Sequence, residues 1–378
     1  MKLHSVLIAL AAIFYLAPAD AYAYDMLVGG IYYDKNDDGT TVTVTYKYFD
    51  DSCAPEYTVS SPYAGTVTIP SSVTSRGKKY TVTAIGDHAF ECCSRLKAVV
   101  IPETVTSIGN CAFLGTGITR LKLPSSLTSI GRCAFMSCQR LVSINIPDNL
   151  EYIGSYAFAS SGLDVASYDG LVYVDGGKAL VGTVSDYNEQ EIRPASGTRI
   201  IADDIFPYNL DAGQQAVTLP ASVTALSGNP FACCSSRVFY TVNDDNPCYD
   251  SRNYDSHNYS NTIIHTATNT LVVGCENSKI PATVEGIGDK AFANRTFESI
   301  ELPAAWVRCS DTAFFGCENL VRVTCRAEVP PTLTTDPRPA GESFFSLSSA
   351  TYLYVPAASV AAYQASPFGQ QFAGVRAL

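Results

Sequence analysis

The stretch Ile85-Gly86-Asp87-His88-Ala89-Phe90 returns along the chain at intervals of 22 or 23 residues. Its clearest copies begin again at Ile108, Ile130 and Ile153. The repeats are marked by a series of phenylalanines: Phe90, Phe113, Phe135, Phe158, Phe206, Phe231, Phe292, Phe314 and Phe345. A fixed period of this size is typical of a solenoid, in which each repeat buries its apolar positions only against its neighbours.

A second pattern inside each repeat predicts one short strand. Leu96-x-x-Val99-x-Ile101 has the L-x-x-L-x-L spacing of a leucine-rich repeat, and a proline usually closes the segment. Trp306 takes an apolar position of the same pattern and is expected in the core. A glycine that follows the repeat isoleucine is expected in a tight turn with positive φ: Gly86, Gly109, Gly131, Gly154 and Gly288. The fold class predicted is mainly β with short helical or irregular turns.

The repeats also divide the chain. We expect a secretory signal peptide over residues 1–23, an N-terminal β-hairpin cap over 24–68 and a solenoid over 69–325. The last repeat and a C-terminal cap, with a strand at 352–356 and a short helix at 357–365, are expected within 326–378. Two insertions interrupt the solenoid, a hairpin at about 165–185 and a Tyr/Asn-rich segment at about 241–275.

The N-terminal segment and the net charge limit the classes of protein to which this chain can belong. The apolar run from Val6 to Ala17 and the Ala21-Tyr22-Ala23 site predict export with cleavage after about Ala23. No later stretch is long and apolar enough for a membrane span. The net charge of −11 argues against nucleic acid, which needs basic patches. A secreted, periplasmic or cell-surface location is therefore expected.

The thirteen cysteines recur in register with the repeats. Cys93, Cys138, Cys234 and Cys317 each follow a repeat phenylalanine by three residues, whereas Cys111 and Cys133 each precede one by two. One interpretation is a buried column of free thiols. The other is a disulfide between Cys111 and Cys133, since rungs ~4.8 Å apart fall inside the ~4.4–6.8 Å Cα range of disulfides. Cys248 and Cys275 are a further candidate pair, and the absence of Cys-x-x-Cys argues against zinc.

The phrase I-P-x-x-V-x-x-I-G-x-x-A-F, complete at residues 101–113, resembles the BspA-like leucine-rich repeat family with repeats of the Treponema pallidum type. The segment from Asn246 to Cys275 and the tail around Leu353-Tyr354-Val355-Pro356 resemble segments of Bacteroidetes members. A tandem echo of five residues, at 250–254 and 255–259, departs from the family. The resemblance implies a curved solenoid that is exported or surface-exposed and often takes part in adhesion to host proteins or other cells.

The sequence gives little support for a catalytic or a metal-binding site. Asp34-Lys35-Asn36-Asp37-Asp38-Gly39 matches the start of a calcium loop, but its twelfth position is Thr45, and the same residues suit a hairpin turn. No catalytic motif accompanies the histidines. The alignment of repeats sets His88 against Asn110, Arg132, Tyr156 and Lys290, as a variable exposed position. We expect no enzyme, no cofactor and no metal site.

Two binding surfaces are predicted. On a concave sheet, the outward positions of the strands carry Lys97, Arg120 and Lys122 in basic rungs and Glu298 and Glu301 in an acidic one. The second surface is the insertion, with Tyr249, Arg252, Tyr254, His257 and Tyr259. We expect non-catalytic, adhesin-type binding of a host matrix protein, a glycan or another cell. The alternative is a structural or envelope-associated protein that binds a bacterial envelope component.

Overall fold

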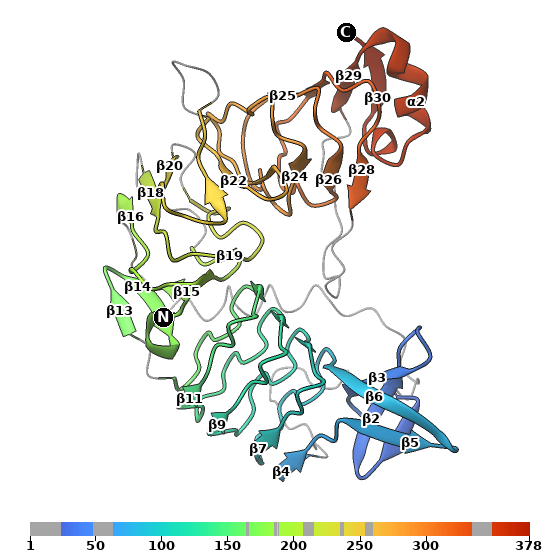
Figure 1. The fold of residues 1–378 in the computed structure, drawn as a ribbon, viewed down its shortest axis with the longest axis vertical. Coiled ribbons are helices and arrows are strands. Elements are labelled where there is room, and N and C mark those ends of the chain that lie inside the picture. The colour runs from blue at the N-terminus through green and yellow to red at the C-terminus, as the bar shows by residue number, and fades with distance from the viewer. Residues whose placement is uncertain are drawn as a thin grey trace.

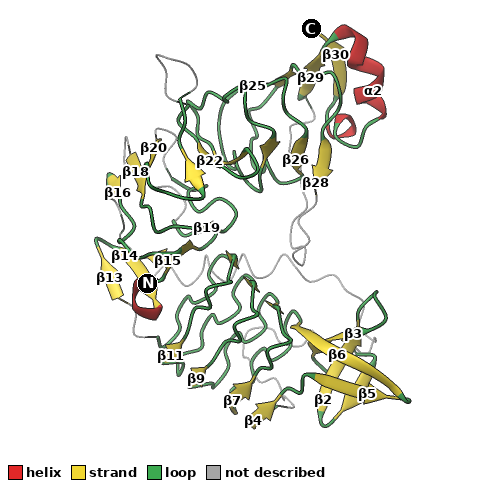
Figure 2. Cartoon of the chain, viewed as in Figure 1, coloured by secondary structure: helices red, strands yellow, loops and turns green. Residues whose placement is uncertain are grey.

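The structure is a computed structural model that describes residues 24–47, 63–163, 166–184, 187, 189–206, 215–234, 238–253, 260–334 and 350–378. The repeats stack into a solenoid bent like a letter C (Figure 1). Strands and loops make up almost all of the described chain, and α2 (Val360–Ala365) is its single α-helix (Figure 2). The mainly β solenoid predicted from the repeat is confirmed. The expected signal peptide lies outside the described residues.

The N-terminal tip of the C is a small sheet that covers the first rung. Strands β1 (Met26–Val28), β2 (Ile31–Lys35) and β3 (Thr41–Thr45) pair antiparallel, and β3 continues in parallel with β6 (Lys78–Ile85). Strand β5 (Ser72–Ser75) pairs antiparallel with β6 and so extends this sheet beyond residue 68. The cap thereby covers an apolar end of the stack that would otherwise meet water.

The calcium-like segment is the hairpin turn between β2 and β3. The Asp38 carboxylate accepts hydrogen bonds from the backbone N–H groups of Thr40 and Thr41, at 2.6 and 2.7 Å. The Thr41 hydroxyl also donates to it, and these bonds lower the pKa of Asp38 to about 2. The carboxylate oxygens of Asp38 are therefore hydrogen-bonded within the turn. In the described part of the chain, no group of three His, Cys, Asp or Glu side chains is placed to hold a metal ion.

Each regular repeat contributes two short strands, where the sequence predicted one. The L-x-x-L-x-L strand lies on the outer rim of the C, and a second strand that contains the repeat isoleucine lies on the inner rim (Figure 1). The outer strands are β4 (Gly65–Thr68), β7 (Leu96–Val100), β9 (Arg120–Leu121), β11 (Ser143–Ile144), β16 (Glu191–Ile192), β18 (Gln215–Leu219), β20 (Val238–Val242), β25 (Ser299–Leu302) and β27 (Arg322–Cys325). The inner strands after β6 are β8 (Ser107–Ile108), β10 (Ser129–Ile130), β12 (Tyr152–Ile153), β17 (Ile200–Ile201), β19 (Ala225–Leu226), β24 (Gly286–Ile287), β26 (Arg308–Ser310) and β28 (Thr332–Thr334).

The two insertions join the inner rim. The first forms β13 (Ala166–Tyr168), β14 (Leu171–Val174), the 3-10 turn η1 (Asp175–Gly177) and β15 (Ala179–Thr183), which pairs in parallel with β17. The second forms β21 (Tyr249–Asp250), β22 (Ile263–His265) and β23 (Thr270–Val273), which pairs in parallel with β24. Each insertion therefore supplies one rung of the inner sheet.

The C-terminal tip closes the second arm. Strand β29 (Tyr352–Val355) is followed by the 3-10 turn η2 (Ala357–Ser359), α2, and the 3-10 turn η3 (Gly369–Gln371). The chain then returns as β30 (Gly374–Ala377), parallel to β29. The strand and helix expected at 352–365 are present, whereas β30 was not predicted, because only its pairing with β29 makes this short segment a strand.

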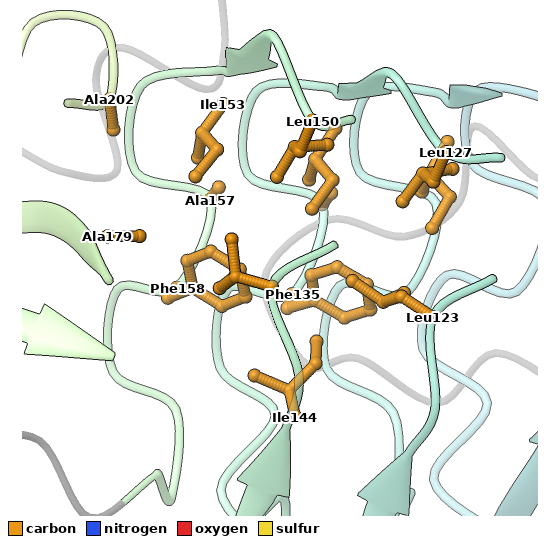
Figure 3. Packing of buried hydrophobic residues seen from close by; sticks show 14 of the residues in the cluster. Leu123, Leu127, Phe135, Ile144, Leu150, Ile153, Ala157, Phe158, Ala179 and Ala202 are labelled. Atoms are coloured by element: carbon orange, nitrogen blue, oxygen red, sulfur yellow. The ribbon is translucent and has the colours of Figure 1, made fainter. Parts of the chain in front are cut away.

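The core is a column of stacked side chains between the two rims. The rings of Phe90, Phe113, Phe135 and Phe158 follow one another with centroid distances of 5.1, 5.2 and 5.5 Å. Figure 3 shows Phe135 and Phe158 side by side between the apolar residues of the two strand columns. Trp306 is fully buried, as predicted. Each such side chain contributes about 1.5–3 kcal/mol by its removal from water.

The repeat glycines do not have positive φ, which corrects the prediction, and those at positions 109, 131 and 154 are needed for space. Gly86, Gly109, Gly131, Gly154 and Gly288 all lie outside the positive-φ region. A Cβ on Gly131 would lie 2.5 Å from the carbonyl carbon of Gly109, and one on Gly154 would lie 2.4 Å from the backbone nitrogen of Arg132. The rungs thus touch backbone to backbone at this column. Positive φ occurs two residues later, at His88, Cys111, Cys133, Tyr156 and Lys290.

The positions with positive φ also correct the alignment of His88 with the other repeats. The structure aligns His88 with Cys111 and Cys133, not with Asn110 and Arg132, because all three share φ values near +55° (59°, 54° and 55°). His88 is half-buried, and its Nδ1 lies 2.6 Å from the Glu91 carboxylate. It is therefore a paired side chain and not a freely exposed one.

Within the described residues, no two cysteines are joined by a disulfide. Cys93, Cys138, Cys234 and Cys317 are buried, whereas Cys111 and Cys133 are half-buried. The buried cysteines do not form a continuous column, because Thr116 lies between Cys93 and Cys138 and its hydroxyl is 3.2 Å from the Cys138 sulfur. The candidate pair Cys248 and Cys275 is not bonded, because the Cys275 thiol lies in the core and contacts the side chain of Asn261 at 2.9 Å.

We predict that Gly131→Ala lowers the free energy of unfolding by about 1–3 kcal/mol, because the new methyl group overpacks the contact with the Gly109 rung. Gly182→Ala is the matched control, since no atom lies within 4 Å of a Cβ built there and its φ is not positive. Urea unfolding followed by circular dichroism measures both. Equal stability of the two variants would contradict the backbone contact.

Candidate binding surfaces

The outer strands of the first arm, which pair as β4 with β7 and β9 with β11, present the three cations predicted to bind. Lys97, Arg120 and Lys122 are exposed, whereas the alternating Leu96 and Leu121 are buried. The rungs lie in register, since β9 pairs in parallel with β11 and Arg120 stands opposite Ser143. The backbone therefore holds these side chains side by side on one face.

This face lies on the convex rim, which corrects the expectation of a concave sheet. In Figure 1, β7, β9, β11 and β25 follow the outside of the C, while β19, β24 and β26 follow its inside. The inner rungs are drawn together by hydrogen bonds across the bend. Asp203 N–H donates to the Ile153 carbonyl at 2.9 Å, and Ile153 N–H donates to the Ser227 hydroxyl at 2.9 Å. The bend therefore closes on the inner strands and turns the outer strands outwards.

The outer face of the first arm is basic in a chain whose net charge is −11. Exposed Arg95 and Arg140 adjoin the three cations, and strands β4, β7, β9 and β11 contain no Asp or Glu. Exposed apolar side chains lie between the cations, since Val100 is 52% exposed and Val142 is 54% exposed. We call this set of residues the basic outer face.

The two predicted acidic residues lie on the outer face of the second arm. Glu298 and Glu301 are exposed there, but Glu301 forms an ion pair with Arg326. The Arg322 guanidinium stands over the Tyr354 ring at 3.8 Å from its centroid. This part of the outer face is therefore of mixed charge and not an acidic rung.

Sequence analysis missed a ladder of arginine and tyrosine at the C-terminal end of the outer face. Tyr352 and Tyr354 point outwards from β29 because the alternating Leu353 is buried. Arg376 of β30 lies over the Tyr352 ring at 3.5 Å, and its Nη1 donates to the Tyr354 hydroxyl at 3.3 Å. The Tyr-x-Tyr alternation at 352–354 was a visible signal, but its partner arginines could not be assigned without the pairing of β30.

The insertion does not expose the aromatic surface that was predicted from Tyr249 and Arg252. Tyr249 is 6% exposed, and its hydroxyl accepts a hydrogen bond from Leu226 N–H at 2.9 Å. Arg252 is held by the Asp250 carboxylate at 2.7 Å and, outside the insertion, donates to the Thr283 hydroxyl at 3.1 Å. Both side chains therefore fasten the insertion to the solenoid. Tyr254, His257 and Tyr259 lie outside the described residues.

We predict that Tyr249→Phe lowers the free energy of unfolding by about 1–3 kcal/mol, because Leu226 N–H loses its buried acceptor. The control is Tyr168→Phe, since the Tyr168 side chain is 58% exposed. Thermal unfolding of the two variants measures the difference. Unchanged stability of Tyr249→Phe would show that the hydroxyl is dispensable to the fold.

Comparison with known proteins identifies the repeat. Residues 66–173 and 271–330 match the family described as BspA type leucine rich repeat region, in six copies. These two segments of the chain are BspA-type leucine-rich repeats. The matched segments contain the regular rungs of both arms, and the insertions with their irregular rungs lie mostly between them. A search of curated proteins finds no match.

Several solved structures resemble this BspA-type solenoid. A leucine-rich repeat protein from Bacteroides ovatus is 18% identical, with 94% of this chain and 77% of that chain covered and a TM-score of 0.35. A leucine rich cell surface protein from Faecalibacterium prausnitzii is 20% identical, with 94% and 96% covered and a TM-score of 0.33. The pneumococcal vaccine antigen PcpA is 13% identical, with 89% and 94% covered and a TM-score of 0.30.

The inner face of the BspA-type solenoid holds a hollow of about 700 Å³ between the two arms, lined by both polar and apolar residues. Its lining comes from distant repeats and includes Ser129, Glu151, Tyr152, Asp289 and Arg308. At the base of the bend, Lys290 donates to the buried Asp203 carboxylate at 2.9 Å, and the Tyr152 hydroxyl lies 3.4 Å from the same oxygen. Three separate repeats thus meet at one carboxylate.

We predict that Lys290→Met lowers the free energy of unfolding by about 2–4 kcal/mol, because it leaves the Asp203 carboxylate buried without its cation. The Asp203 side chain is 4% exposed and that of Lys290 is 32% exposed. Arg326→Met is the matched control, since it breaks an ion pair whose partners are both 59% exposed and should cost about 0.5 kcal/mol or less. Urea unfolding compares the two, and equal losses would contradict a special role for the pair at the bend.

Proposed function

We propose that this BspA-type protein is a non-catalytic binding protein of the adhesin type, which recognises an acidic partner protein through the basic outer face. The observation that carries the proposal is the charge of that face. Five exposed cations, at positions 95, 97, 120, 122 and 140, lie on or beside the outer strands of one arm in a chain whose net charge is −11. Against the negative background of the rest of the chain, such a patch attracts and orients an acidic partner.

The chemistry of the face favours a protein over a glycan. Val100 and Val142 expose apolar area between the cations, and protein interfaces combine buried apolar contacts with arginine. Strands β4, β7, β9 and β11 carry no aromatic side chain on which a sugar ring could stack. The partner expected on a host cell or another cell is therefore a protein with an acidic surface.

Rigidity supports the same proposal. The cations belong to rungs that are hydrogen-bonded in parallel and packed on buried Leu96, Val99 and Leu121. A partner that docks here meets a preformed surface, so little ordering opposes binding. Lys97, Arg120 and Lys122 form no ion pair within the described ranges. The hydrogen bond from Ser125 and the charge of Lys122 lower the pKa of the exposed Glu103 carboxylate, so a partner competes with this carboxylate at Lys122.

The expected export of the protein is consistent with a partner outside the cell. Residues 1–23 are expected to direct secretion, with the mature protein in the periplasm, at the cell surface or outside the cell. None of the described helices is both long and apolar enough to cross a membrane. A partner would then be met on a host matrix or on a neighbouring cell.

We predict that replacing Lys97, Arg120 and Lys122 by Glu weakens binding to an acidic partner by at least about tenfold, because the attraction becomes repulsion. The test measures binding of the purified protein to immobilised host matrix proteins, with mucin as the glycan probe. For the wild type, affinity for the bound protein should fall steeply as salt rises.

The matched control replaces Lys78, Lys79 and Lys279, which are exposed but lie outside the basic outer face, by Glu. It carries the same change of net charge and should bind nearly as the wild type does. Equal losses in both triple variants would leave only a non-specific effect of charge. Saturable binding to mucin alone would contradict a protein partner, and an absence of binding to every host probe would favour the alternative of a bacterial envelope partner.

A further inference from the structure

Two half-buried cysteines lie next to each other in consecutive rungs of the first arm. Cys111 and Cys133 each precede a stacked phenylalanine by two residues, and the rings of Phe113 and Phe135 lie 5.2 Å apart and nearly parallel, at 8°. Cys111 N–H donates to the Arg132 carbonyl at 2.9 Å, which keeps the two turns in register. A rung separation of this size lies within the ~4.4–6.8 Å Cα range that a disulfide requires.

The backbone gives both side chains the same direction. Cys111 has a φ of 54° and Cys133 a φ of 55°, so each follows the same turn geometry at the same point of its rung. Since equivalent side chains of stacked rungs project in parallel, the two sulfur atoms come side by side. Their thiols form a hydrogen bond with each other.

Other cysteines of the described chain do not combine this placement with access. The Cys138 thiol is buried and donates to the Phe113 carbonyl at 3.0 Å, and the buried Cys317 thiol donates to the Phe292 carbonyl at 3.0 Å. Cys92 is half-buried like Cys111, but Gly115 occupies its position in the next rung.

The pair also has an activated member. The hydrogen bond from Cys111, together with the neighbouring Arg132 guanidinium, lowers the pKa of Cys133 to about 7 despite burial. The same hydrogen bond and burial raise the pKa of Cys111. Cys133 is therefore the sulfur that gives up its proton more readily and Cys111 the one that keeps it, which is the division of roles that thiol–disulfide exchange uses.

We propose that Cys111 and Cys133 form a reversible redox site, which a low-molecular-weight disulfide oxidises to a disulfide across adjacent rungs. The Cys133 thiolate attacks one sulfur of the small disulfide, forms a mixed disulfide and releases one thiolate. Cys111 then gives up its proton and attacks the Cys133 sulfur, so that the Cys111–Cys133 bond forms and the second small thiol leaves. The protein loses two hydrogen atoms, and the small disulfide is reduced to two thiols.

The bond would fasten two rungs that carry the basic outer face. It closes a loop of about 22 residues in the unfolded chain and so restricts that state. Because the thiols lie on the turns between rims and not on the outer strands, oxidation should raise the thermal midpoint without changing the cations that a partner meets. This inference is independent of the identity of that partner.

The test treats the reduced, folded protein with oxidised glutathione at pH 7 and maps the peptides by mass spectrometry. The wild type should lose two thiols and yield one cross-link between the peptides of Cys111 and Cys133, with a higher thermal midpoint that dithiothreitol reverses. Cys111→Ser should instead accumulate glutathione on Cys133, because the resolving thiol is absent. Cys133→Ser should react at least about tenfold more slowly at Cys111, since the low-pKa thiol is gone.

Cys92→Ser is the matched control, and it should cross-link as the wild type does. Circular dichroism before treatment confirms that each variant is folded. Isolation of the protein with the bond already present would support the site. The proposal is overturned if the folded wild type forms only mixed disulfides, or if its cross-link joins other cysteines.

Discussion

The in-register contact of one rung with the next is the constraint on which the rest of the structure depends. The phenylalanine rings repeat every 5.1–5.5 Å in the first arm, and the backbones meet so closely at the glycine column that no Cβ fits. Any residue type that recurs in the sequence period therefore becomes a column in space. Phenylalanine produces a core column, while lysine and arginine at outward strand positions produce a charged surface.

The insertions interrupt this stacking, and individual side chains repair it. Asp175 of η1 accepts the Ile146 N–H at 2.9 Å beside β11, at a break in the outer sheet. The Asn261 side chain accepts from Tyr240 N–H and donates to the Val238 carbonyl, as a neighbouring strand would. The buried Arg295 donates to the carbonyls of Phe231 and Ala232 at 3.0 and 2.8 Å and so joins rungs on either side of the second insertion. Such edges would otherwise be open to pairing with other chains.

The sequence was sufficient for the solenoid, the Phe column, Trp306 and the outward position of Lys97, Arg120 and Lys122, because these follow from periodicity and strand alternation alone. It was insufficient for the direction of the bend, which depends on contacts among Ile153, Asp203 and Ser227 that no period encodes. The inner strands were missed because most are only two residues long and exist only through parallel pairing. Tyr249 was wrongly predicted to be an exposed binding residue because its sequence neighbours are polar. In the structure its hydroxyl accepts a hydrogen bond from Leu226 N–H.

The direction of the bend determines which face is free to meet a partner. On the inner side the cations serve the protein itself: Lys290 binds Asp203, Arg199 donates to the carbonyls of Pro147 and Leu150, and Arg308 donates to the Thr268 carbonyl. A partner that entered the hollow would have to replace these bonds. On the outer side of the first arm the cations lie on or beside regular strands. The backbone N–H and C=O groups of these strands are hydrogen-bonded between neighbouring strands, so the cationic side chains are not needed to bind them. The fold therefore uses its inner charges to hold the curve and leaves the outer ones exposed, where the proposed partner would meet them.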